Sequence, residues 1–236
     1  MIPLLQNPDD FPPVEKALLT PPGLLAAGGQ LTPEWLLAAY SRGIFPWFTH
    51  GEPLLWWSLN PRLILLPEKI RVTRSLAKMI RKRHFDIRCD TDFAAVIHAC
   101  AAPRAGAAGT WITPSIIEAY CRMHELGYAH SIESWHHGKL VGGLYGIALG
   151  RVFFGESMFS HESNASKVAL VNLANRLYTH RYSLIDCQMD TKHLSSMGAH
   201  TISRNEFIRK LQHRITQQPL PGCWDDYQDF YRADRL

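Results

Sequence analysis

The chain has 236 residues, which suits one large domain or a domain with a small partner and excludes a large multidomain assembly. Hydrophobic residues make up 46% and charged residues 19%, so the chain has ample apolar surface to bury and is not an intrinsically disordered protein. A net charge of +4 indicates nucleic-acid binding only if the positive residues are clustered.

The first 61 residues are rich in Pro, Gly and Trp and predict a single helix. Thr32 can cap this helix, Pro33 suits its first position, and Gly43 can end it in a left-handed turn. The segments that follow, Gly43–Phe48 and Leu54–Ser58, are too aromatic to be linkers, so we expect them to pack against another part of the protein.

A more regular pattern begins near residue 62. Apolar spacing and capping residues first predict two short apolar stretches at 63–66 and 70–73 and a basic helix at 75–83. A strand at 85–89 and helices at 92–102 and 114–127 follow, and then three strands at 130–135, 139–148 and 151–159. The predicted order ends with a helix at 164–180, a strand at 182–188 and a last helix capped by Ser203. From residue 85 onward this order resembles the GCN5-related N-acetyltransferases, whose central strands splay apart to admit an acyl donor. We therefore expect an α+β fold, with a small N-terminal α/β domain at 1–61 and an acyltransferase-like domain at 62–236 that has a mixed central sheet flanked by helices.

The loop that would hold coenzyme A in such a fold lacks the expected glycines. Backbone N–H groups of a glycine-rich loop close on the pyrophosphate in those enzymes. Here Ser160–Lys167 contains no glycine and includes Glu162. Lys167 and the helix start could still bind one phosphate. A coenzyme A-dependent N-acetyltransferase therefore stays an alternative, beside an enzyme with another acyl donor.

Positive charge is concentrated in one stretch. From Arg62 to His84 there are eight basic residues and one acidic residue, a charge of +7, which leaves −3 for the remainder. Within it, Arg74, Lys78 and Arg81 share one helical face, and Lys82 follows. A solvated helix face is the simpler interpretation, but so unbalanced a segment favours a polyanionic partner such as nucleic acid.

Three aromatic residues lie where they could contact such a partner. Trp47, Trp111 and Tyr120 offer flat rings that can stack on an exposed base, at about 1–3 kcal/mol each. Tryptophan packs in a core more often than it binds a base. Together with the basic helix, these rings would also suit a non-catalytic nucleic-acid-binding module.

Polar groups interrupt two apolar strands. In the strand Leu184–Gln188, alternation places Asp186 and Gln188 on one side and the intervening residues on the other. Glu156 is likewise a carboxylate within an apolar strand, the one that precedes it in the chain. A carboxylate in a central strand costs several kcal/mol unless it has a partner or a function. Two such carboxylates on neighbouring strands, beside a glutamine, indicate a functional site.

Nine blocks of the sequence together resemble one family, the leucyl/phenylalanyl-tRNA–protein transferases. The blocks are GIFPWF, LLWWS with NPR, GTWIT, HELGYAHSIE, LVGGLYGIALG, FFGESMFS, NASK, LIDCQ and HLSSMGA, and they lie between Gly23 and Trp224. The resemblance implies transfer of Leu, Phe or, less readily, Met from aminoacyl-tRNA to the N-terminal Arg or Lys of an acceptor protein, which creates an N-terminal degradation signal.

The resemblance also implies roles for individual residues. An apolar pocket for the aminoacyl side chain maps onto Leu144, Phe153, Leu170, Leu173 and Ile185, with Ser157 and Met158 nearby. The basic helix would bind the acceptor stem of the tRNA, and Trp47 and Trp111 would bind its terminal adenosine.

Positioning should supply most of the rate, because the donor ester is already activated and an α-amine has a pKa near 7.7–8.0. We expect Asp186 to hold the attacking amine or the cationic acceptor. The Gln188 carbonyl would accept the hydrogen bond of the amine, and Glu156 would order the site or recognise the basic acceptor side chain.

No cofactor and no metal are expected. The five cysteines form no Cys-x-x-Cys pair, and no His-Glu-x-x-His spacing occurs among the twelve histidines. Two acidic residues within the first ten argue against a secretory leader, and no apolar run is long enough to span a bilayer. We therefore expect a cytoplasmic protein with no membrane partner.

Overall fold

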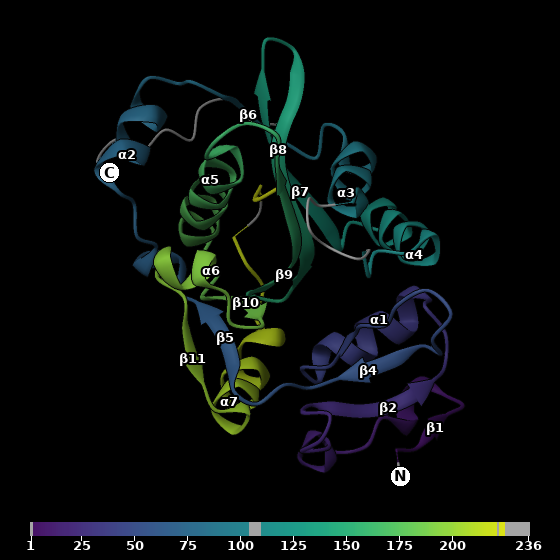
Figure 1. Cartoon of the computed structure of the whole chain (residues 1–236). Coiled ribbons are helices and arrows are strands. Elements are labelled where there is room, and N and C mark those ends of the chain that lie inside the picture. The colour runs from purple at the N-terminus through teal and green to yellow at the C-terminus, as the bar shows by residue number, and fades with distance from the viewer. Residues whose placement is uncertain (1, 104–109, 221, 225–236) are drawn as a thin grey trace.

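The computed structural model describes residues 2–103, 110–220 and 222–224. Two sheets of very different size organise these residues, and helices pack on both (Figure 1). The chain is therefore of the α+β class, as expected. Gly109, which belongs to the GTWIT block, and residues 225–236 of the expected second domain lie outside the described residues.

The N-terminal segment builds a four-stranded sheet in the order β1-β2-β4-β3. Its strands are β1 (Leu4–Leu5), β2 (Leu24–Gly28), β3 (Phe45–Pro46) and β4 (Leu55–Trp57), with short 3-10 turns η1 (Pro8–Asp10) and η2 (Val14–Lys16). The ring of Trp56 in β4 is fully buried and stacks on Trp35 of α1 (Pro33–Ser41), 6.2 Å between centroids. The aromatic segments therefore pack as expected.

Helix α1 begins and ends where predicted, but its N-cap makes no side-chain hydrogen bond. Gly43 follows the helix with φ +74°, a left-handed conformation that glycine adopts without steric cost. Thr32 stands at the N-cap position, but its side chain makes no capping hydrogen bond. The prediction of a Thr32 cap was wrong. Pro33, which needs no N–H partner at the first helical position, begins the helix without it.

The second sheet has seven strands in the order β11-β5-β10-β9-β8-β7-β6. The strands are β5 (Arg62–Leu65), β6 (Asp86–Cys89), β7 (Ala129–His136), β8 (Lys139–Leu149), β9 (Val152–Ser160), β10 (Leu184–Gln188) and β11 (His200–Ile202). Only β9 and β10 pair in parallel, so the sheet is mixed. The stretch at 70–73 forms no strand, and β11 was not expected.

Helices cover both faces of this sheet. Figure 1 shows α5 (Ala165–Thr179) on one face, and α3 (Phe93–Ala101) and α4 (Pro114–Glu125) on the other. The basic helix α2 (Arg74–Arg81) packs outside α5, and the 3-10 turn η3 (Pro67–Lys69) contacts α5 as well. A Cβ at Gly142 of β8 would collide with Ala165, so this glycine lets the start of α5 approach the sheet.

Helix α7 (Arg204–Ile215) contacts both the N-terminal segment and the larger sheet. The unexpected short helix α6 (Lys192–Ser196) follows β10, and α7 contacts α1. Ser203 caps α7 as predicted, because its hydroxyl accepts from the Glu206 N–H. Among the helices of the described ranges, none has both the length and the apolar character that a membrane span requires.

Candidate active site

A cavity opens where strands β9 and β10 separate. The two strands pair only from Leu184 with Val152 to Asp186 with Phe154. Beyond that point β9 continues along β8, whereas β10 stays paired with β5 on its other side, where Gln188 pairs with Leu63. The cavity has a volume of about 730 Å³ and is lined from β8, β9, β10 and α5. Its size is typical of a pocket for a small molecule or a large side chain.

The wall of the cavity is largely apolar. All five side chains expected to form an aminoacyl pocket line it: Leu144, Phe153, Leu170, Leu173 and Ile185. The neighbouring Ser157 and Met158 line it as well. Each of these five side chains is buried in the protein. An occupant of the cavity would therefore contact apolar side chains that have little exposure to solvent.

A cluster of polar side chains lies at one part of the wall. Glu156 of β9 accepts hydrogen bonds from the Tyr40 hydroxyl at 2.6 Å and the Tyr120 hydroxyl at 3.2 Å. The two hydroxyls also contact each other. The Gln188 amide N–H donates to the same carboxylate at 3.4 Å. Glu156 and Gln188 both line the cavity, so this cluster presents a carboxylate and an amide to an occupant.

Burial sets the protonation of this cluster. It raises the pKa of both tyrosines well above the ordinary value, so Tyr40 and Tyr120 stay protonated and donate. Burial also raises the pKa of Glu156 to about 7, although the two tyrosine hydrogen bonds act in the opposite direction. Near neutral pH, Glu156 therefore exchanges readily between its acid and carboxylate forms, as a catalytic acid–base group must.

Asp186 does not face the cavity, contrary to expectation. Its carboxylate accepts from Arg62 Nε at 2.8 Å and from Arg62 Nη2 at 2.6 Å, and neither side chain has any exposed surface. Asp186 therefore cannot touch an attacking amine. Its Oδ1 atom accepts from the Gln188 backbone N–H at 3.1 Å, so Asp186 contacts the backbone that carries Gln188.

The alternation expected along β10 fails at its last residues. The register with β5 shifts between Asp186 and Gln188, and Gln188 has φ +54°. A bulge of this kind turns a side chain toward the other face of the sheet. Ile185, Cys187 and Gln188 all line the cavity as a result, while Asp186 points away from it.

The basic helix is arranged as predicted. Arg74, Lys78, Arg81 and Lys82 are exposed, while Leu76 and Ile80 are buried. Helix α2 contacts α5, which supplies part of the cavity wall. Arg62 also contributed to the charge of this segment in the sequence, but it is buried against Asp186 and adds nothing to the exposed charge.

The three aromatic residues expected to bind tRNA differ in position. Trp111 is partly exposed and lines the cavity. Trp47 is partly buried, packs edge-on against Trp57 and is not among the residues described as lining the cavity. Tyr120 is fully buried, with its hydroxyl at Glu156. No base can stack on a ring in that position, so stacking by Tyr120 is corrected to a role in holding Glu156.

Two further cavity residues were not singled out from the sequence. Cys187 lines the cavity, but burial raises the pKa of its thiol well above the ordinary value, so it does not supply a thiolate nucleophile. His193, at the start of α6, lines the cavity too. Burial and the charge of Lys167 lower its pKa, which favours a neutral imidazole.

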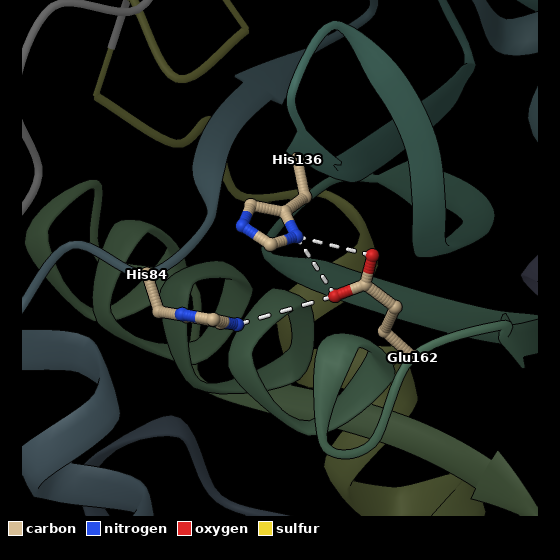
Figure 2. A group of neighbouring side chains, drawn as sticks. All are labelled: His84, His136 and Glu162. Atoms are coloured by element: carbon tan, nitrogen blue, oxygen red, sulfur yellow. Dashed lines mark hydrogen bonds and ion pairs between the residues drawn. The ribbon is translucent and has the colours of Figure 1, made fainter.

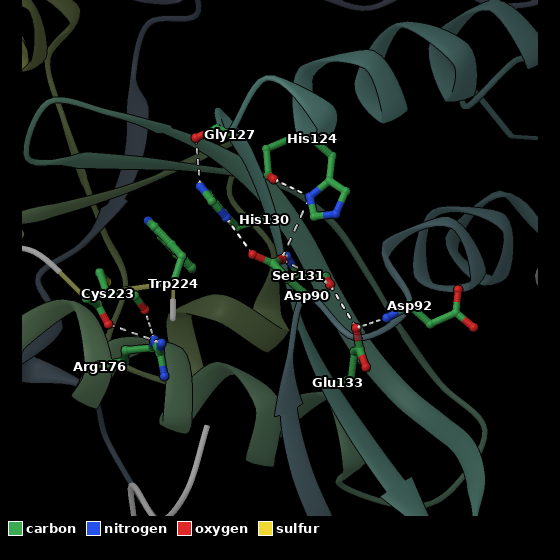
Figure 3. A network of polar contacts seen from close by, with 12 residues as sticks. Asp90, Asp92, His124, Gly127, His130, Ser131, Glu133, Arg176, Cys223 and Trp224 are labelled. Carbon is green, nitrogen blue, oxygen red and sulfur yellow. Dashed lines mark hydrogen bonds and ion pairs between the residues drawn. The ribbon is translucent and has the colours of Figure 1, made fainter. Parts of the chain in front are cut away.

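Histidines and carboxylates form two clusters away from the reacting groups. His84, His136 and Glu162 converge at the edge of the sheet (Figure 2). Asp90, His124 and His130 form a more buried network beneath Trp224, whose ring stacks on His130 at 3.9 Å (Figure 3). Both ring nitrogens of His130 already contact oxygen atoms there, those of Asp90 and of the Gly127 carbonyl. The second cluster therefore serves as a structural link to the C-terminal segment.

Known proteins of one family match nearly the whole chain. A family model described as leucyl/phenylalanyl-tRNA protein transferase matches residues 64–212, and a model of the N-terminal domain of that transferase matches residues 29–60. Leucyl/phenylalanyl-tRNA–protein transferases of Azoarcus sp. (strain BH72) and Aromatoleum aromaticum are 63% and 59% identical over 224 residues, which cover 95% of this chain and 95% and 94% of theirs. A functionally unknown conserved protein from Staphylococcus epidermidis is similar in structure over 76% of this chain and 68% of its own, with a TM-score of 0.42 and 13% identity.

Proposed function

Because the chain belongs to the leucyl/phenylalanyl-tRNA–protein transferase family, we propose that its cavity holds an amino acid still esterified to tRNA while an acceptor amine attacks the ester. The enzyme is an aminoacyltransferase that acts with leucyl- or phenylalanyl-tRNA on protein. One observation carries the assignment of the site: the apolar cavity is the place where Gln188 and Glu156 are brought together.

The aminoacyl side chain occupies the apolar wall in this proposal. Leu144, Phe153, Leu170, Leu173 and Ile185 would surround it. Leu and Phe, and less readily Met, are side chains that gain free energy from such burial, about 1.5–3 kcal/mol each. A charged side chain would lose its hydration there without finding a partner on this wall.

The reaction forms a C–N bond between the acceptor nitrogen and the ester carbonyl carbon, and it breaks the C–O bond to the ribose. The nitrogen must lose a proton and the departing ribose oxygen must gain one. In this proposal the Gln188 side-chain carbonyl accepts a hydrogen bond from the amine, and the Glu156 carboxylate takes up the proton of the amine and returns a proton to the departing ribose oxygen. A carboxyl with a pKa of about 7 is well matched to an amine with a pKa near 7.7–8.0.

The acceptor is proposed to be a protein that begins with Arg or Lys. The product then carries Leu, Phe or Met at its N-terminus, which acts as a degradation signal. The family description implies a protein acceptor, and the anionic form of Glu156 in the cavity wall is compatible with a cationic one.

A transfer assay tests the proposal directly. The enzyme is incubated with Phe-tRNA that carries a label on the amino acid, and with a peptide that begins with Arg. We expect the label to move to the peptide, and to a Lys peptide, but not to the same peptide with an acetylated N-terminus. Label that stays on tRNA, together with thermal stabilisation by acetyl-CoA and not by tRNA, would instead favour the coenzyme A-dependent acetyltransferase. Binding of tRNA without any transfer would favour the non-catalytic module.

For tRNA binding we propose the exposed residues of α2, Arg74, Lys78, Arg81 and Lys82, as contacts to the phosphate backbone. Trp111, in the cavity wall, is the better placed ring for the terminal adenosine. Trp47 stays a second proposed contact to the 3′ end, on the N-terminal sheet.

Neutralising α2 should weaken tRNA binding without regard to the amino acid that the tRNA carries. The triple variant Arg74→Ala, Lys78→Ala, Arg81→Ala removes three phosphate contacts. We expect the slope of log affinity against log salt to become shallower by about 2–3. Fluorescence titration of labelled tRNA at several salt concentrations measures it. An unchanged slope would mean that the helix only solubilises the protein.

The proposal also includes the division into domains, the arrangement of the larger sheet and the location of the protein. The chain divides at residues 61 and 62 into a small N-terminal domain that helps to bind the 3′ end of tRNA and a catalytic domain, a division supported by the two separate sheets. The separation of β9 from β10 supports a splayed, GCN5-related arrangement of the larger sheet. A charged tRNA as donor supports a cytoplasmic location.

A further inference from the structure

Three side chains from separate segments converge at one edge of the larger sheet. His84 follows α2, His136 ends β7, and Glu162 lies in the loop between β9 and α5. Figure 2 shows both imidazoles directed at the carboxylate of Glu162. One ligand atom from each residue lies within 4.8 Å of the other two. These segments are far apart in the sequence, which explains why residue spacing gave no sign of the cluster.

His136 and His84 approach the carboxylate of Glu162 to different extents. His136 Nδ1 is within hydrogen-bond distance of both carboxylate oxygens, at 3.1 Å from Oε1 and 2.9 Å from Oε2, whereas His84 Nε2 lies 4.0 Å from Oε2, too far for a hydrogen bond. A tetrahedral ion with bonds of about 2.0–2.1 Å needs ligand atoms about 3.3 Å apart. The two distances to Oε2 bracket this value, so small rotations of the partly exposed side chains would bring all three atoms to one ion.

We propose that His84, His136 and Glu162 bind a divalent transition-metal ion of the zinc class. Two imidazoles and one carboxylate are a ligand set that Zn²⁺ accepts, and they leave a position for water. The set contains no thiolate and only one carboxylate, so it does not suit Mg²⁺ or Ca²⁺, which require several oxygen ligands. None of the three residues lines the cavity, so such an ion would not contact the transferred amino acid.

Such an ion would join three parts of the proposed catalytic machinery. His84 lies three residues after the C-terminal end of α2, the basic helix. Glu162 is next to His161, which lines the cavity, and it precedes α5, which supplies much of the apolar wall. A bound ion would therefore fix the end of the basic helix and the loop before α5 to the β7–β8 hairpin.

Metal binding to the full-length, tag-free and chelator-treated enzyme tests this proposal. We expect one equivalent of Zn²⁺ to bind by calorimetry and to raise the thermal midpoint, and Co²⁺ to give a visible d–d spectrum. Mg²⁺ should have no effect. His84→Ala and His136→Ala should each weaken Zn²⁺ binding at least about tenfold and abolish the rise in midpoint. His98→Ala, at an exposed histidine of α3, is the matched control and should bind as the parent does.

The outcomes separate clearly. Equal loss in His98→Ala, undiminished binding in the two cluster variants, or an equal response to Mg²⁺ would each overturn the proposal. Binding that leaves the thermal midpoint unchanged would overturn the link between the three segments. His84 has 43% of its side chain exposed, so truncating it leaves no buried cavity, and its metal-free midpoint provides the check on folding. None of these measurements depends on transferase activity.

Discussion

Replacing Gln188 with alanine is expected to lower the rate of aminoacyl transfer about 100-fold while leaving the affinity for aminoacyl-tRNA nearly unchanged. The side chain lines the cavity beside Glu156, on a backbone that a bulge and a positive φ turn toward the substrate. Its carbonyl is the neutral acceptor proposed to orient the attacking amine. In the proposed site the donor would be held mainly by the apolar wall and the basic helix, which the substitution leaves in place.

Single-turnover transfer with preformed Phe-tRNA measures the effect, alongside titration of the same tRNA. Gln188→Glu keeps an acceptor oxygen at the same position and should retain more activity than Gln188→Ala. Asp190→Ala is the matched control, because Asp190 is exposed, lies two residues further along and only accepts from Ser195. If affinity for tRNA falls as far as the transfer rate does, Gln188 serves donor binding rather than the orientation of the amine.

Local sequence patterns were sufficient for most of the larger sheet and its helices. Strand alternation and helix caps predicted β6 to β10 and the helices around them, because these elements bury regular apolar faces. Thr113 and Ser203 cap their helices as expected. The short elements α6 and β11 were missed, since three to five residues carry too little periodicity to stand out.

Only some features of the polar residues at the cavity could be predicted from the sequence. Asp186 was correctly recognised as a carboxylate that needs a partner, but its partner, Arg62, is 124 residues away and was counted with the exposed basic segment. Strict alternation then placed Asp186 on the side of Gln188, and the bulge that reverses this leaves no mark in the residue pattern. Tyr40 and Tyr120 meet Glu156 only through the packing of α1 and α4, which no local pattern specifies.

The substitution Asp186→Ala should destabilise the protein by about 3–5 kcal/mol, because it leaves the Arg62 guanidinium buried without its counter-charge. For a chain of this length the thermal midpoint should fall by about 6–20 °C. The rings of Phe45 and Phe207 lie over the guanidinium at 4.8 and 4.6 Å, and they cannot replace the carboxylate. Urea and thermal denaturation of the variant and the parent measure the loss.

A second variant distinguishes positioning from catalysis by Asp186. In Arg62→Met with Asp186→Leu, two apolar side chains replace the ion pair, so no buried charge remains and stability should exceed that of Asp186→Ala. Transfer should stay low in both variants, because the Gln188 N–H has lost the Asp186 oxygen that fixes it, and Asp186→Asn, which keeps an acceptor there, should restore part of the rate. Normal transfer in the double variant would contradict the positioning role, because that variant has no Asp186 oxygen to accept from the Gln188 N–H. The measured stability of the double variant separates this result from a folding defect.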